Sequence, residues 1–155
     1  MKFLETIRDR LPAIAVIAVL GLGLGVIGWR FVSPSPESRP AANRVVTPDT
    51  VKLAALSGRA KAGKTAFDEN CAACHGDNAT GTEQGPPLLH DTYNPGHHDD
   101  NSFLRAVKDG VPRHHWNFGD MAPQPQVSRN ETISIIEYVR EMQRANGIFW
   151  RQHRM

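Results

Sequence analysis

Apolar and polar positions along the chain predict helices and no strands. Residues 11–29 hold no charged side chain over nineteen consecutive positions. A helix of that length spans roughly 28 Å, close to the thickness of the hydrocarbon core of a bilayer. Further along, apolar residues recur at spacings of three and four, the period of an amphipathic helix, without the strict alternation of half-buried strands. We therefore expect an all-α domain that follows a single transmembrane helix.

The clearest amphipathic pattern covers residues 128–147. Ser128 and Glu131 predict a capping box at its start, and Gly147 predicts its C-terminal end. Its inward-facing positions are Ile135, Tyr138, Val139 and Met142. A shorter helix is expected at residues 101–111, before a loop region rich in glycine and proline. Its inward-facing positions are Phe103, Leu104 and Val107.

Composition divides the chain into four parts. Residues 1–32 form the N-terminal tip and the transmembrane segment. Residues 33–50 contain four prolines among mostly polar side chains. Such a composition is typical of an extended linker, with a reach on the order of 50 Å. The folded domain is expected at residues 51–147, followed by a tail at residues 148–155.

The sequence CAACH, at residues 71–75, carries the most specific chemistry. Cys71 and Cys74 are the two cysteines of the chain, and His75 follows directly, at the end of a helix expected within residues 57–76. This C-x-x-C-H spacing is the attachment signature of c-type haem. The two thiols add to the vinyl groups of adjacent pyrroles, and the histidine then lies beneath the ring, where its imidazole can bind iron.

Three other interpretations of the two cysteines are weaker. A thioredoxin-like dithiol does not need the adjoining histidine and belongs in a βαβ context that is absent here. A zinc site commonly uses two such pairs, and this chain has one. A disulfide across so short a loop would constrain little of the chain.

The N-terminal charges predict the topology of the anchor. Lys2, Arg8 and Arg10 precede the apolar stretch, which favours a cytoplasmic N-terminus. The stretch is longer than the core of a usual signal peptide and no convincing A-x-A site follows, so an uncleaved anchor is favoured over a cleaved signal. We expect a single-pass protein of the bacterial inner membrane with its C-terminal domain in the periplasm, where bacteria attach c-type haem. Residues 43–155 hold thirteen basic and thirteen acidic side chains, which argues against a nucleic-acid partner.

The segment from residue 58 to residue 147 resembles the class I monohaem cytochromes c. In that family the first helix carries G-x-x-x-F-x-x-x-C-x-x-C-H, matched here by Gly63, Phe67, Cys71, Cys74 and His75. The resemblance implies a domain of three to four helices wrapped around one covalent haem c. It also implies that the first and last helices cross, with Gly63 and Phe67 against Tyr138.

The loop GPPL, at residues 85–88, matches a second motif of the family. The resemblance implies that the Pro86 carbonyl accepts a hydrogen bond from Nδ1–H of His75, which would orient the ring. It implies further that Leu88 packs on the haem edge. The family supplies a methionine as the sixth iron ligand, and Met121 stands in the expected place before the last helix.

Met121 leaves alternatives open. Ala122 follows it, where the family commonly has proline, so this loop departs from the family pattern. Met121 could instead be a buried gap-filler, with His114 or His115 as the iron ligand. Methionine ligation raises the haem potential, because a soft neutral sulfur stabilises Fe(II).

Five further histidines precede Met121, namely His90, His97, His98, His114 and His115. They are interpreted as solvated loop residues, as a partner of a haem propionate or a replacement for Met121, or as ligands of a second ion. For the last alternative we name His97, His98, His114 and His115, with copper as the ion, because imidazole suits copper and zinc. Trp116 is expected to pack over the haem.

These patterns together predict a membrane-tethered periplasmic electron carrier that cycles between Fe(II) and Fe(III), and not an enzyme. Its expected partners are membrane redox complexes such as a quinol–cytochrome c reductase and a terminal oxidase. One alternative is a haem-bearing subunit of a periplasmic dehydrogenase or terminal oxidase, with the catalytic centre in another chain. Another is a haem or copper sensor that uses the loop histidines.

Overall fold

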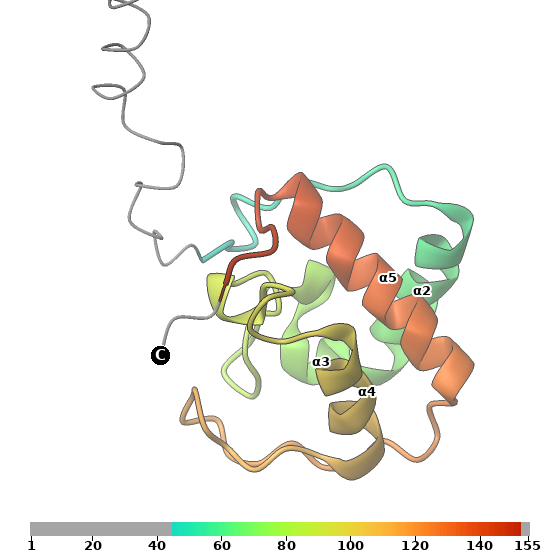
Figure 1. The fold of residues 1–155 in the computed structure, drawn as a ribbon, viewed down its shortest axis with the longest axis vertical. Helices are drawn as coiled ribbons and strands as arrows, with labels where there is room; N and C mark the ends of the chain where they lie inside the picture. The colour runs from blue at the N-terminus through green and yellow to red at the C-terminus, as the bar shows by residue number, and fades with distance from the viewer. Residues whose placement is uncertain (1–44, 153–155) are drawn as a thin grey trace, which may run out of the picture. The chain divides into compact units, whose positions relative to one another are not determined.

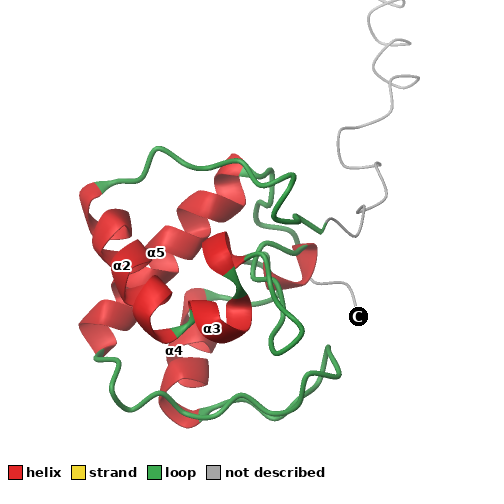
Figure 2. Ribbon diagram, turned by 180° about the vertical axis from the view of Figure 1, so that it is seen from behind, coloured by secondary structure: helices red, strands yellow, loops and turns green. Residues whose placement is uncertain are grey.

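The computed structural model describes residues 45–152 of the chain. Its helices, in chain order, are α2 (Gly58–Asn70), α3 (Ala72–His75), η2 (Asp77–Ala79), η3 (Asp91–Tyr93), α4 (Asp100–Asp109) and α5 (Arg129–Ala145). Within this part of the chain there is no strand, only two isolated bridges, and long loops connect the helices (Figure 2). The all-α prediction is therefore confirmed for the folded domain.

Helices α2 and α5 cross against each other and form the frame of the domain (Figure 1). At the crossing, Gly63 lies directly against the backbone of Ser134 and Ile135. One turn further along α2, the rings of Phe67 and Tyr138 lie 5.4 Å apart, and both residues are fully buried. The predicted crossing of the two helices is confirmed. Phe67 contacts Tyr138 as expected, while Gly63 lies against the backbone of α5.

The ends of α5 follow the sequence prediction. The Ser128 side chain accepts a hydrogen bond from the Glu131 backbone, and the Glu131 carboxylate accepts one from the Ser128 backbone. At the other end Gly147 has a φ of 76°, and the Ile148 N–H donates to the Gln143 carbonyl at 2.8 Å. This is the Schellman arrangement that a glycine after a helix favours. The four predicted inward-facing residues of α5 are all buried.

The helix expected within residues 57–76 is interrupted at Cys71, which has a φ of −121°. Helix α2 ends at Asn70, whose side-chain amide donates to the Ala66 carbonyl at 2.9 Å. Short polar side chains compete in this way with the continuing helix. The single turn α3 then carries the chain to His75, so the C-x-x-C-H motif begins at the break in the helix.

Helix α4 begins at a side-chain cap, where Asp99 accepts from the Ser102 N–H at 2.8 Å. It ends at Gly110, which has a φ of 77°. None of its residues is fully buried, although Phe103 and Val107 pack on the core. They are half-buried because they also line the cavity described below.

The packed unit extends past the expected boundaries at residues 51 and 147. Val46 is buried and its N–H donates to the Leu89 carbonyl at 3.1 Å. Ile148, at the other end, is buried in the same core. The last residues of the expected linker are thus part of the domain.

The predicted anchor and most of the predicted linker lie outside the described residues. Among the residues that are described, no helix has both the length and the apolar character needed to cross a bilayer.

Candidate haem-binding site

A cavity of about 720 Å³ lies beside the helix frame. Helices α2 and α3 contribute Phe67, Cys71 and His75 to its lining, and the following loop contributes Pro86 and Leu88. Further lining residues are Phe103, Val107, Val111, Trp116, Phe118 and Met121. The volume lies within the range of pockets that hold a cofactor or ligand, and the lining is mostly apolar, as such pockets are.

His75 is held in one orientation by the backbone. Its Nδ1–H donates to the Pro86 carbonyl at 2.9 Å, as predicted. This bond fixes the tautomer and leaves the Nε2 lone pair available as a metal ligand. Burial lowers the pKa of His75, although the Pro86 carbonyl opposes this, so the imidazole is neutral at neutral pH.

The loop after α3 reaches Pro86 through a close approach at Gly85. A Cβ atom on Gly85 would lie 2.8 Å from the Cys74 carbonyl oxygen and 3.1 Å from the Cys74 Cβ. Only glycine therefore lets this loop pass so near the attachment motif. The two cysteines form no disulfide, and burial raises the pKa of Cys71 to about 11, with a smaller contribution from the Cys74 thiol.

Met121 lines the same cavity on the loop of residues 110–123, which we call the Met121 loop. Its backbone pairs with Val111 through two hydrogen bonds of 2.9 Å. The ring of Pro123 lies against Gly110, where a Cβ atom would be 3.0 Å from the proline Cδ. With the extra residue Ala122 in the loop, Met121 still lines the cavity, while Met121 as an iron ligand stays a prediction.

Trp116 also lines the cavity and is tied to Tyr93. The indole Nε1–H donates to the Tyr93 hydroxyl at 3.1 Å, and the pKa of Tyr93 is raised to about 12 by burial. The indole also packs against His90, with ring centroids 5.0 Å apart. His90 is itself buried and accepts at Nδ1 from the Thr92 N–H at 3.1 Å, so it is a structural residue of this loop.

Arg140 and Tyr93 contribute to the site but were not identified from sequence. Arg140 of α5 is buried, and its guanidinium donates to the carbonyls of Tyr93 and His98 and to the Asp100 carboxylate. The only signal in the sequence was the place of Arg140 within the helical pattern of α5. An arginine is rarely fully buried without a partner, so such a position indicates that partners exist. Its partners became visible only in the folded chain.

Three of the four histidines considered for a second metal come together. Nitrogen atoms of His97, His98 and His115 all lie within 4.8 Å of one another. His114 stands beside them, its ring centroid 4.2 Å from that of His115, and its Nδ1–H donates to the Pro112 carbonyl at 2.9 Å. Burial and, to a smaller extent, the neighbouring histidines lower the pKa of His98 to about 4 against the opposing effect of the Thr92 carbonyl, so this imidazole is neutral at neutral pH.

The family model described as Cytochrome c matches residues 60–143, which is more than half of the chain. The chain therefore belongs to the cytochrome c family, whose members bind covalent haem c and generally carry electrons. Among curated proteins and among solved structures, no match to the chain is found. The described residues fit the group. Two free thiols lie at and just after the break in the helix, an oriented imidazole lies next to them, and Met121 lines the apolar cavity.

Proposed function

We propose that this protein is a membrane-tethered periplasmic electron carrier with His75 and Met121 as the axial ligands of a single haem c. The observation that carries the proposal is the shared cavity, in which a backbone-oriented imidazole and a thioether both lie. When bound, haem c supplies a one-electron Fe(III)/Fe(II) couple.

Each residue of the chain has a defined task in this proposal. Pro86 holds the proton on Nδ1 of His75 and keeps Nε2 directed as a ligand. Met121 supplies a soft neutral sulfur, which favours the reduced state and raises the potential. Two protein ligands also leave no position for a substrate, which supports electron transfer over catalysis.

The proposed location and partners follow from the sequence outside the described residues. The uncharged stretch at residues 11–29 supports an anchor in the bacterial inner membrane, and the proline-containing segment supports a tether. A tethered carrier could move between a quinol–cytochrome c reductase and a terminal oxidase without leaving the membrane surface.

The deciding experiment is an optical spectrum of oxidised protein purified from membranes, whose mass should include residues 1–30 and one haem. Methionine ligation predicts a far-red sulfur-to-iron charge-transfer band. The band should be lost in Met121→Ala and retained in His114→Ala and His115→Ala. A wild-type spectrum without the band, or persistence of the band in Met121→Ala, would contradict the assignment of Met121.

The same preparation separates the two alternatives. A stable stoichiometric complex in detergent would favour a haem-bearing subunit of a periplasmic dehydrogenase or oxidase. Carbon monoxide binding to the reduced protein at neutral pH would favour a sensor, because it requires a sixth ligand that is easily displaced.

A further inference from the structure

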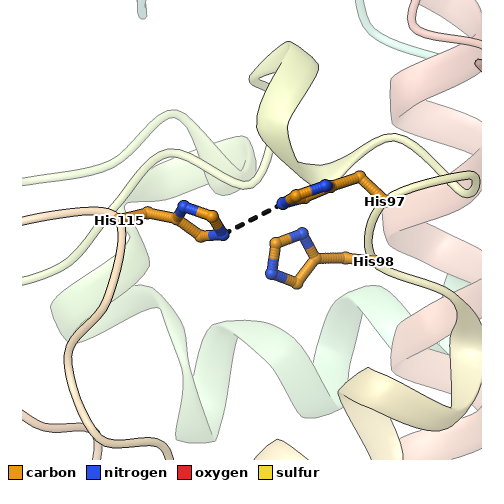
Figure 3. A group of neighbouring side chains, drawn as sticks. All are labelled: His97, His98 and His115. Atoms are coloured by element: carbon orange, nitrogen blue, oxygen red, sulfur yellow. Dashed lines mark hydrogen bonds between the residues drawn. The ribbon is translucent and has the colours of Figure 1, made fainter. Parts of the chain in front are cut away.

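The histidine cluster, defined as His97, His98 and His115, joins two loops at the cavity. His97 and His98 lie between η3 and α4, while His115 lies on the Met121 loop. All three residues also line the cavity. Figure 3 shows their side chains pointing toward one another from the two loops.

The spacing of the nitrogen atoms suits a metal ion. Nε2 of His97 and Nε2 of His115 are 3.0 Å apart. Metal–nitrogen bonds of about 2.0–2.1 Å place two ligand nitrogens about 3.3 Å apart at a tetrahedral angle. One nitrogen of each of the three residues lies within 4.8 Å of those of the other two, and His115 is exposed, so its side chain has room to adjust around an ion.

His98 has the orientation of a metal ligand. Its Nδ1–H donates to the Thr92 carbonyl at 2.8 Å, which fixes the tautomer and leaves the Nε2 lone pair free to bind. Ligating histidines usually make such a bond through their other ring nitrogen. The His98 backbone is held as well, because its carbonyl accepts from Arg140. This half of the cluster is therefore fixed before any ion binds.

The neighbouring imidazoles of His97 and His115 share one proton between their Nε2 atoms in this structure. A metal ion placed there would accept both lone pairs, and the proton would move to the other ring nitrogen or to solvent. The cluster has no carboxylate among its members. Ions such as Mg²⁺ and Ca²⁺ prefer oxygen ligands, whereas imidazole suits Zn²⁺ and Cu²⁺.

We propose that His97, His98 and His115 form a binding site for one late first-row divalent metal ion, such as Cu²⁺ or Zn²⁺. The ion would clamp the Met121 loop to the loop before α4, next to the cavity. Cu²⁺ should bind more tightly than Zn²⁺, in keeping with the general order of stability for nitrogen ligands.

Calorimetry on the haem-loaded full-length protein, prepared without a polyhistidine tag and freed of metal with a chelator, tests the proposal. One equivalent of Cu²⁺ or Zn²⁺ should bind, and Mg²⁺ should not. Substitution of any one member of the cluster by alanine should weaken binding at least about 100-fold, because even outer-shell partners of a metal site change affinity by about 10–100-fold. His114→Ala is the matched control, since its ring packs on His115 outside the cluster.

Equal binding by wild type and a variant with all three histidines changed to alanine would overturn the proposal. So would an equal loss in His114→Ala. The far-red haem band should stay unchanged in each cluster variant, and its disappearance would show that the histidine positions Met121, which would overturn its assignment to the second ion alone. The calorimetric stoichiometry is measured without reference to the axial ligands, so failure of Met121 as a ligand and failure of the metal site are separate results.

Zn²⁺ offers a second measurement, because it does not change its own oxidation state. A cation beside the cavity should raise the haem midpoint potential in wild type, since added positive charge disfavours Fe(III). In His98→Ala the potential should not respond to Zn²⁺. An unchanged wild-type potential at saturating Zn²⁺ would overturn the placement of the ion beside the haem cavity.

Discussion

The wall that carries His75 and the loop that carries Met121 face one cavity but are held by different interactions. His75 ends α3, the single turn that follows α2, and α2 packs closely against α5; a backbone carbonyl orients the His75 ring. Met121 lies on a long loop held within itself by two backbone bonds between Val111 and Met121 and by a bond from the Arg113 N–H to the Asp120 carboxylate. The first wall is therefore fixed by the frame of the protein, while the second depends more on what it encloses and on its contacts with the loop before α4.

The largest loss of stability is expected at the crossing of α2 and α5. In Gly63→Ala the new methyl group would meet the backbone of Ser134 and Ile135, which cannot move aside as a side chain can. We expect the free energy of unfolding to fall by about 3 kcal/mol or more, the upper range for overpacking. Denaturant titration of the haem-loaded protein measures this.

Gly58→Ala is the matched control in the same helix. A Cβ atom there has no neighbour within 4 Å, so the substitution should be neutral or slightly stabilising. A cost as large as that of Gly63→Ala would show that the helix frame is sensitive to any added side chain, and the close crossing would not explain the effect.

Arg140 connects the two regions, and its removal gives an intermediate effect. Arg140→Met keeps an apolar stem but leaves the His98 carbonyl without this donor, while Gln143 still donates to the Tyr93 carbonyl at 3.0 Å. The buried Gln143 side-chain oxygen also loses its donor, at 2.7 Å, and these two unpaired acceptors together predict a loss of about 2 kcal/mol in unfolding free energy. Arg144→Met, one turn on and exposed, should cost little.

Arg140 also supports the loop that carries His98. In Arg140→Met the affinity for Zn²⁺ should therefore fall as well, while the far-red haem band persists. Loss of the band in this variant would show that the Met121 loop depends on α5 more directly than its contacts indicate.

The smallest effect is expected within the Met121 loop. Gly119 has a φ of 97°, and a Cβ atom there would have no neighbour within 4 Å. Gly119→Ala should cost about 1 kcal/mol, from the backbone conformation alone. A cost equal to that of Gly63→Ala would show that this loop is packed as tightly as the helix crossing.

Local signals in the sequence were sufficient for helix α5. The capping box at Ser128, the glycine after α5 and the buried stripe of α5 depend on neighbours three or four residues away, and the structure has all of them. The attachment motif is local in the same sense, since Cys71, Cys74 and His75 lie within five positions. The bond from His75 to Pro86 spans eleven residues and came from the family resemblance.

The sequence by itself therefore determined an all-α domain with a haem-attachment motif and named its candidate ligands. Only the tertiary structure decided that helix α2 breaks at Cys71, that Arg140 holds the loop of His98, and that His114, of the four histidines named, lies outside the cluster. The first feature is a kink set by one side chain. The other two bring together residues that lie on separate loops or on a loop and a helix. Periodicity records which face of a helix is buried, but it does not record where a loop of a dozen residues returns to the fold.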